Sequence, residues 1–243
     1  MNQQGYYIKE NILSPTETQQ LGQWIENATH DNPNFRVGKD LFAIRNLLGE
    51  IPALQSLLQN NRLTKLLDNH FTDQNYHCIK AIFFDKPPQS NWVVNWHQDL
   101  TINVKDKPAS FLYSGLASGS SSQDDFRQWI QKSSFWSVQP PLRYLQNIVT
   151  VRLHLEDCLA ENGALKILAG SHQLGITAAQ ELEQLKENFE EVTCEVPQGG
   201  ALVMSPLTWH ASSKNRSTQH RRVIHLEFSD MHLSQGLEWS ECY

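Results

Sequence analysis

Two periodicities divide the chain into a helical N-terminal part and a strand-rich remainder. A capping box at Ser14–Glu17, with proline at the first helical position, predicts the start of a helix. Apolar residues then recur at helical spacing, at Leu21, Trp24, Ile25 and Ala28. A second zone, from about Leu41 to Phe71, is rich in leucine and is interrupted near Gly49 and Pro52. Both stretches are typical of amphipathic helices.

From residue 77 onward, short runs of apolar and β-branched residues are bounded by glycine, proline and asparagine. Such runs predict strands rather than helices. The predicted strands are His77–Asp85, Trp92–Asn103, Asn147–Glu156, Glu191–Val196, Ala201–Met204 and Arg222–Phe228. Several short strands with helices packed outside them predict a mainly β domain, either a sandwich or a barrel.

The stretch from about 105 to 141 departs from this pattern. It contains a serine- and glycine-rich run at 114–122, a short predicted helix around Phe126–Ile130, and the aromatic pair Phe135-Trp136. Segments this long without regular structure are usually covers over a site or disordered insertions. We expect a lid at about 105–141, and a mobile insertion without a catalytic role is the equal alternative.

Composition narrows the class of protein. A chain of 243 residues with 40% hydrophobic content suits one domain, here 1–243. A net charge of -6 argues against binding nucleic acid by neutralising phosphates. No apolar run of about 18 residues predicts a membrane span, and the start resembles no signal peptide. The four cysteines form no CxxC pair, so we expect a cytoplasmic protein with reduced thiols.

The most informative residues are His97 and Asp99, two positions apart on a predicted strand. Residues i and i+2 of a strand point to the same face, so the imidazole and the carboxylate should project together. Two histidines and one carboxylate are the ligand set of non-haem Fe(II) oxygenases, which leaves coordination positions open for O₂ chemistry. An HxD triplet is a weak signal by itself, so the second histidine decides the hypothesis.

His210 is the favoured third ligand among ten histidines. The rivals in the second half are His154, His172, His220 and His225. Eleven and twelve residues after His210 come Arg221 and Arg222, and a guanidinium is the best anchor for the far carboxylate of 2-oxoglutarate. Arg221 and Arg222 lie on opposite faces of their predicted strand. Alternation does not show which face lines the site, because helices can cover the outer face of a jelly-roll sheet.

These features together resemble the phytanoyl-CoA dioxygenase family. The segments that carry the resemblance are Trp96-His97-Gln98-Asp99, Glu161-Asn162-Gly163-Ala164-Leu165, Ala169-Gly170-Ser171-His172, and His210 with Asn215 and the arginine pair. The opening segment Gly5–Leu21 is also similar, so the resemblance covers nearly the whole chain outside 105–141. Ala169 replaces the family's usual proline, which we assign to a change in a turn.

The resemblance implies a double-stranded β-helix, the jelly roll of cupin-like proteins, with Fe(II) held by His97, Asp99 and His210. It places the 2-oxoglutarate anchor at Arg221, and it gives Ser212 a share in the same contact. The implied reaction uses O₂, releases succinate and CO₂, and hydroxylates a small molecule. Halogenases of this architecture lack the carboxylate ligand, so Asp99 favours hydroxylation or a related desaturation or ring closure.

Two other classes stay open on the sequence alone. A non-catalytic jelly-roll binding protein would keep the fold, although the complete ligand set argues against it. A zinc hydrolase would use the same ligand types, but the chain has no HExxH helix.

The substrate is the least determined feature. We expect the pocket to be lined by Trp92, Gln98, Thr101 and Trp136, together with the lid. That lining predicts a partly apolar, aromatic cavity for a lipid-like, terpenoid, alkaloid or amino-acid-derived molecule. The sequence indicates no obligate protein partner and does not reveal the oligomeric state.

Overall fold

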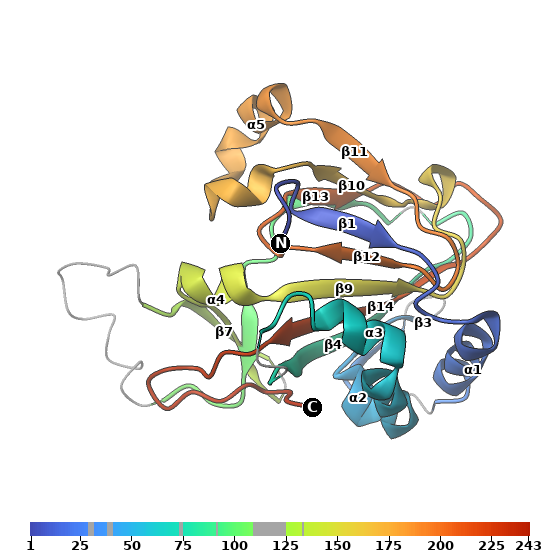
Figure 1. The fold of residues 1–243 in the computed structure, drawn as a ribbon, viewed down its shortest axis with the longest axis horizontal. Helices are drawn as coiled ribbons and strands as arrows, with labels where there is room; N and C mark the ends of the chain where they lie inside the picture. The colour runs from blue at the N-terminus through green and yellow to red at the C-terminus, as the bar shows by residue number, and fades with distance from the viewer. Residues whose placement is uncertain (29–31, 38–40, 73–74, 91, 109–124, 133) are drawn as a thin grey trace.

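The computed structural model describes residues 1–28, 32–37, 41–72, 75–90, 92–108, 125–132 and 134–243. Strands dominate this part of the chain, and the helices lie mainly to one side of the largest sheet (Figure 1). The strands are β1 (Tyr6–Lys9), β2 (Phe35–Val37), β3 (Leu41–Arg45), β4 (His77–Lys86), β5 (Val94–His97), β6 (Ile102–Val104), β7 (Arg127–Gln131), β8 (Trp136–Gln139), β9 (Val149–His154), β10 (Leu165–Leu168), β11 (Glu191–Cys194), β12 (Ala201–Met204), β13 (His210–Ser212) and β14 (Arg221–Ser229). The helices are α1 (Pro15–Glu26), α2 (Leu47–Glu50), η1 (Pro52–Gln59), α3 (Asn61–Leu67), α4 (Leu142–Asn147), η3 (Ala160–Asn162), η4 (Ser171–Leu174), η5 (Ala179–Glu181) and α5 (Leu182–Asn188).

The strands form three antiparallel sheets. The largest has the order β1-β12-β9-β14-β4-β3-β2, the second β11-β10-β13-β5, and the third β6-β8-β7. Neighbours in these sheets are mostly distant in sequence, as when β14 pairs with both β4 and β9. Two sheets built from such interleaved strands are the jelly roll that the sequence predicts, and that prediction is confirmed.

Alternation along the central strands separates the apolar core from the interior of the jelly roll. On β9, Val151 and Leu153 are fully buried in the core that also holds Leu21 and Leu63 of the helices. Arg152, between them, lines the interior cavity instead. Burial of each large aliphatic side chain contributes about 1.5 to 3 kcal/mol. The sheet is therefore stabilised by its packing against the helices, and its opposite face can carry polar side chains.

Helix α1 begins where the sequence predicts. Ser14 caps it: the Glu17 backbone N–H donates to Ser14 Oγ at 3.3 Å, and the Ser14 N–H donates to the Glu17 carboxylate at 2.7 Å. Asn60 also donates to Glu17, at 2.8 Å, which ties the start of α1 to the start of α3.

Two local predictions are wrong. The zone from Leu41 to Phe71 is not helical throughout, because Leu41–Arg45 forms β3 and pairs with β4. The helix expected around Phe126–Ile130 is strand β7, which pairs with β8. In both places backbone pairing with a neighbouring strand outweighs local helix preference. Of the expected lid at about 105–141, residues 109–124 and 133 lie outside the described residues.

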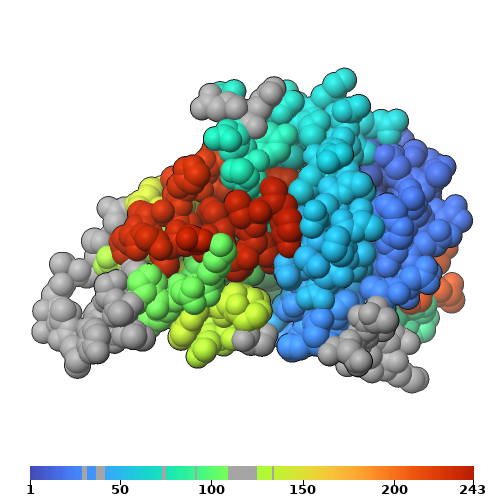
Figure 2. All heavy atoms as spheres, turned by 90° about the horizontal axis from the view of Figure 1, so that it is seen from below, coloured from blue at the N-terminus to red at the C-terminus, as the bar shows by residue number. Residues whose placement is uncertain are grey.

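The C-terminal segment closes the lower face of the molecule. Figure 2 shows these red residues in the middle of that face, beside the cyan helical segment. The Tyr243 and Cys78 backbones exchange hydrogen bonds at 3.1 and 3.2 Å, and the Ala81 N–H donates to the Glu241 carboxylate at 2.9 Å. The chain end therefore supports β4, the strand that forms one wall of the interior cavity. No helix in the described ranges is long and apolar enough to cross a membrane.

Candidate metal centre and pocket

His97 and His210 meet across two paired strands. The register of β13 with β5 places the two residues directly opposite each other, although 112 residues separate them in the chain. Opposed residues of an antiparallel pair have close Cβ atoms, and the two imidazole centroids lie 4.2 Å apart. Strand pairing alone therefore brings the two histidines together.

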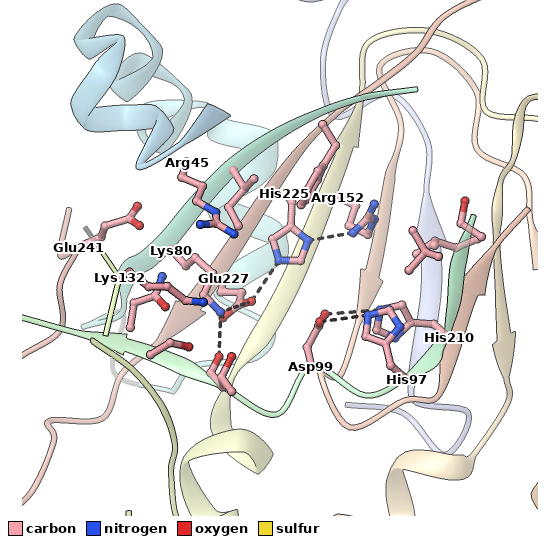
Figure 3. A pocket seen from close by; sticks show the side chains of 18 of the residues that line it. Arg45, Lys80, His97, Asp99, Lys132, Arg152, His210, His225, Glu227 and Glu241 are labelled. Atoms are coloured by element: carbon pink, nitrogen blue, oxygen red, sulfur yellow. Dashed lines mark hydrogen bonds and ion pairs between the residues drawn. The ribbon is translucent and has the colours of Figure 1, made fainter. Parts of the chain in front are cut away.

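Asp99 joins them from the segment just after β5. Its backbone N–H donates to the Pro206 carbonyl at 2.9 Å, which ties this segment to the one that leads into β13. The Asp99 carboxylate oxygens lie 3.6 Å from His97 Nε2 and 3.5 Å from His210 Nε2. The three ligand atoms all lie within 4.8 Å of one another, as Figure 3 shows for the side chains. The expected set of two histidines and one carboxylate is thus brought together.

Backbone carbonyls define which nitrogen of each imidazole is free. His97 Nδ1 lies 2.8 Å from the Asn95 carbonyl, and His210 Nδ1 lies 2.9 Å from the Thr208 carbonyl. A carbonyl oxygen only accepts, so each Nδ1 carries the proton. In the neutral ring, Nε2 then has a lone pair directed toward Asp99. A hydrogen bond from the second ring nitrogen to a carbonyl is the usual support of a metal-ligating histidine.

The protonation states of the centre suit a divalent metal. Burial lowers the pKa of His210 to about 4, so this imidazole is neutral at pH 7. Burial alone would raise the pKa of Asp99, but His210 and His97 outweigh it and lower that pKa well below its usual value. A neutral imidazole and an ionised carboxylate are the forms that bind metal. The donor set and the convergence of its ligand atoms therefore fit Fe(II).

Arg221 extends into the same cavity with unused donor capacity. It is 3% exposed, and its Nη1 donates to the Gly163 carbonyl at 2.6 Å and to Ser212 Oγ at 3.3 Å. Its Nε has no hydrogen-bond partner among the described residues. A buried guanidinium without an acidic partner calls for an anion, because an uncompensated charge away from water is costly. The structure brings Arg221 and Ser212 together, as expected.

Arg222 faces the other side of β14. Its guanidinium contacts the carboxylates of Glu156 and Glu26. Its charge is already compensated there, so it is not available to the cavity. Alternation along β14 thus separates the two arginines between the two faces of the sheet.

Two further cations next to Arg221 were missed by sequence reasoning. Lys86 is fully buried and donates from Nζ to Ser212 Oγ at 2.7 Å and to the Ser213 carbonyl at 2.5 Å. Burial, and then the charge of Arg221, lower the pKa of Lys86 to about 7. Arg152 lines the cavity, and burial lowers its pKa to about 10. Lys86 shares one face of β4 with Lys80, Ile82 and Phe84, and this spacing was the available signal.

The cavity beside the metal ligands has a volume of about 400 Å³. Trp92 and Thr101 line it, as expected. Gln98 and Trp136 are corrections, since neither belongs to the lining in the described part of the chain. Gln98 points away because it alternates with His97 and Asp99. Trp136 packs in a separate apolar cluster behind the third sheet.

Gln98 supports the loops around the centre instead. Its amide donates to the carbonyls of Gly175 and Leu207 at 2.8 and 2.6 Å, and its oxygen accepts from the Thr177 N–H at 3.1 Å. The side chain is 7% exposed, so these bonds are made away from water. Gln98 therefore positions the segment from Leu207 to His210 relative to His97.

Replacement of Gln98 by methionine should destabilise the protein, because buried carbonyls lose their donors while the volume is kept. We expect a loss of about 2 to 4 kcal/mol, or a melting temperature about 5 to 10 °C lower, measured by circular dichroism. Gln173→Met is the matched control, since Gln173 makes one exposed bond to the Gln3 carbonyl. Equal effects of the two substitutions would contradict the positioning role.

The other half of the cavity holds a chain of paired charges. Arg152 Nη1 lies 2.9 Å from His225 Nδ1, His225 Nε2 lies 3.1 Å from Glu227 Oε1, and Lys80 Nζ lies 2.8 Å from Glu227. An arginine only donates, so His225 accepts at Nδ1 and donates from Nε2 to Glu227. Asp99, His225 and Glu227 also converge, but both nitrogens of His225 are engaged. These three residues therefore belong to the network of paired charges and do not form a second metal centre.

The cavity is partly apolar and aromatic, as expected, but it also holds a cluster of charged residues that the sequence did not predict. Charged and polar side chains form much of the lining, including Arg45, Lys80, Asp99, Lys132, Arg152, Glu227 and Glu241. The aromatic residues Phe84, Trp92 and Phe135 complete it. Four of the charged residues, Arg45, Lys80, Arg152 and Glu227, lie on four different strands, β3, β4, β9 and β14. No single stretch of sequence therefore contains the charged cluster.

Glu241 should make stability depend on pH. Burial raises its pKa to about 7, so the folded protein binds a proton that the unfolded chain releases near pH 4.5. Stability from this group is therefore present below about pH 4.5 and is lost as the pH rises to 7, by about 2 to 3 kcal/mol.

Glu241→Gln should remove that part of the pH dependence and stabilise the protein at pH 8, while keeping an acceptor for the Ala81 N–H. Urea unfolding of both proteins at pH 5, 6.5 and 8 measures the difference. Glu238→Gln, at an exposed carboxylate, is the control and should leave the dependence unchanged between pH 5 and 8. A parallel pH dependence in wild type and Glu241→Gln would contradict the assignment.

Comparison with known proteins places this fold among the jelly-roll oxygenases. The model of the family "Phytanoyl-CoA dioxygenase (PhyH)" matches residues 117–223. The match supports the resemblance of this chain to the phytanoyl-CoA dioxygenase family. No curated protein matches the sequence.

Solved structures share the fold at low sequence identity. EctD from S. alaskensis, with 2-oxoglutarate and 5-hydroxyectoine, is 18% identical, covers 93% of this chain and 72% of its own, and has a TM-score of 0.68. AviO1 from Streptomyces viridochromogenes Tue57 is 19% identical over 93% and 90% of the two chains, with a TM-score of 0.62. EvdO2 from Micromonospora carbonacea var. aurantiaca, complexed with 2-oxoglutarate, is 17% identical over 98% and 93%, with a TM-score of 0.61.

Proposed function

We propose that the chain is an Fe(II)- and 2-oxoglutarate-dependent dioxygenase that hydroxylates a small molecule. One observation carries the proposal: the convergent ligand atoms of His97, Asp99 and His210 share a cavity with a buried guanidinium, that of Arg221, which makes no ion pair with a carboxylate in the described part of the chain. A metal centre and a carboxylate anchor in one cavity are the two requirements for chelating a 2-oxo acid. The family and the 2-oxoglutarate complexes of EctD and EvdO2 support the same class.

In this proposal His97, Asp99 and His210 hold Fe(II), which together with 2-oxoglutarate and O₂ supplies the oxidising chemistry. Arg221 donates to the far carboxylate of 2-oxoglutarate from its guanidinium, and Ser212 lies beside it. A guanidinium bonds a carboxylate in a fixed planar geometry, so this contact orients the cosubstrate as well as binding it.

Lys86 and Gly163 hold the anchor in place. Lys86 donates to Ser212, and the Gly163 carbonyl accepts from both Ser212 Oγ, at 2.8 Å, and Arg221 Nη1. The anchor is thus oriented before 2-oxoglutarate arrives, which reduces the free energy lost in ordering the site. The surrounding burial excludes water and strengthens each charged contact.

The size of the cavity limits the substrate. About 400 Å³ must hold both 2-oxoglutarate and the substrate, whereas typical ligand pockets span roughly 300 to 1,000 Å³. A compact small molecule fits this space beside 2-oxoglutarate. Succinate and CO₂ are the expected products of 2-oxoglutarate, and hydroxylation is the proposed outcome for the substrate. Other outcomes occur on this fold, since SnoK is described as a carbocyclase and SnoN as an epimerase.

Anaerobic titration of the Fe(II)-loaded protein with 2-oxoglutarate tests the proposal. The chelate should give a weak visible charge-transfer band that saturates with one 2-oxoglutarate per protein. Succinate should form when O₂ is admitted, more rapidly in the presence of a substrate. Absence of the band in the wild-type protein, with Fe(II) shown to be bound, would exclude this function.

A further inference from the structure

Two cations in the cavity have no role in the proposed metal and cosubstrate sites. Arg45 lies at the end of β3, and Lys132 follows β7. Both line the same cavity as the metal ligands. Figure 3 shows their side chains projecting into it in the half that also contains the Lys80 and Glu227 pair. The two residues come from different sheets, so they belong to two separate walls of the pocket.

The direction of Arg45 is set by strand register. Arg45 pairs with Ile82 of β4, and Ile82 lines the cavity. Directly opposed residues of an antiparallel pair share one face, so Arg45 is held on the interior side. The neighbouring Ile44 is fully buried in the apolar core on the opposite face. The guanidinium is thus directed inward by the fold.

Neither cation has an acidic partner within the described ranges. Neither Arg45 nor Lys132 makes a side-chain hydrogen bond or an ion pair there, whereas Lys80 is paired with Glu227 at 2.8 Å. Both are partly buried. An unpaired guanidinium that is partly withdrawn from water is stabilised by an incoming anion.

The charges of this half of the cavity do not cancel. Lys80 and Glu227 neutralise each other, and the Glu241 carboxylate accepts from the Ala81 N–H. Arg45 and Lys132 then contribute two positive charges against one carboxylate that burial partly neutralises. Arg152 adds a further positive charge, because its guanidinium contacts His225 and no carboxylate. The excess is therefore between two and three positive charges, which favours an anionic ligand.

We propose that Arg45 and Lys132 bind the carboxylate of an organic-acid substrate and thereby place its carbon skeleton beside the metal centre. That the bound acid is a substrate rests on the proposed function, whereas the presence of an anion site does not. A carboxylate fits better than a phosphate, because the second negative charge of a phosphate dianion would lie close to the carboxylates of Glu227 and Glu241. The remaining lining by Phe84, Trp92 and Phe135 suits an apolar body attached to that carboxylate.

Matched pairs of small molecules test the chemical class. The probes are benzoate, phenylacetate and cyclohexanecarboxylate, each with its primary amide, and phenyl phosphate as the phosphate probe. Binding is measured up to 50 mM by ligand-observed NMR on the metal-free protein, with oxalylglycine added to occupy the cosubstrate site. We expect at least one acid to bind tenfold or more tightly than its amide and than phenyl phosphate.

Substitutions test whether the preference for acid over amide depends on Arg45 and Lys132. Arg45→Gln and Lys132→Met should each reduce the acid-over-amide ratio at least fivefold, while the affinity for the amide stays the same. Arg62→Gln and Lys65→Met remove the same charges from α3, outside this cavity, and should leave the ratio unchanged. Equal binding of acid and amide, no binding of any acid, preference for phenyl phosphate, or a ratio unaffected by both substitutions would each overturn the proposal.

A second readout separates this proposal from the proposed function. Arg45→Gln and Lys132→Met should form the Fe(II)–2-oxoglutarate band at the same 2-oxoglutarate concentration as the wild-type protein. If the wild type gives no band but prefers acids through these two residues, the anion site stands and the dioxygenase function fails. If the band forms and the preference is absent, only the substrate class fails.

Discussion

Replacement of His210 by alanine should weaken metal binding by at least about 100-fold and abolish 2-oxoglutarate turnover. In the proposed centre three side chains supply the metal ligands. Loss of one removes a large share of a binding free energy on the order of 10 kcal/mol, where about 3 kcal/mol corresponds to a factor of roughly 100. Co(II), which does not oxidise readily in air, reports the affinity by its visible absorption, and succinate formation reports turnover.

His232→Ala is the matched control, since His232 is exposed and is not among the described residues that line the cavity. It should bind Co(II) as the wild-type protein does. His210→Gln, which retains most of the volume, distinguishes loss of the ligand from loss of the fold through its melting temperature. A His210→Ala protein that is folded and binds Co(II) with unchanged affinity would disprove the proposed centre.

Replacement of Arg221 by glutamine should raise the 2-oxoglutarate concentration needed for half-saturation by roughly 30- to 1,000-fold, since the loss of one partner of a buried charge pair costs about 2 to 4 kcal/mol. Metal affinity should be nearly unchanged, because Arg221 is not a ligand. The anaerobic charge-transfer band measures both quantities in one titration.

Arg222→Gln is the informative control for this prediction. The two arginines are adjacent in sequence, but Arg222 contacts Glu156 and Glu26 on the outer face of β14. Its loss should lower stability and leave the half-saturating 2-oxoglutarate concentration within about twofold of the wild-type value. If Arg222→Gln impaired 2-oxoglutarate binding as strongly as Arg221→Gln, the anchor would be wrongly assigned.

The contrast between these arginines illustrates how far sequence patterns reach. Alternation along β14 predicted that the two side chains face opposite ways but not which face lines the cavity. The choice depends on helices α1 to α3 covering the Ile224 and Leu226 face, which the tertiary structure establishes. Only the resemblance to a family selected Arg221 from sequence.

Gln98 shows the reverse case. A family motif placed it in the pocket, but a residue between two ligands on an extended segment points away from both. Its partners, Gly175, Thr177 and Leu207, are between 77 and 109 residues away in the chain, so no local pattern could reveal them. Strand β7 was missed for a different reason, since its pairing with the next strand, β8, overrides its local helix preference.

The sequence by itself determined the elements whose cause is local: the capped helix α1, most of the long strands, and the residue types of a metal centre, His97, Asp99 and His210. Local hydrogen bonding and side-chain periodicity act over a few residues and are therefore readable along the chain. The tertiary structure alone decided the register that opposes His97 and His210, and the gathering of Arg45, Lys80, Lys132, Arg152 and Glu227 in one cavity. These side chains come from strands that are distant in sequence, and only the packing of the sheets sets their distances and charges.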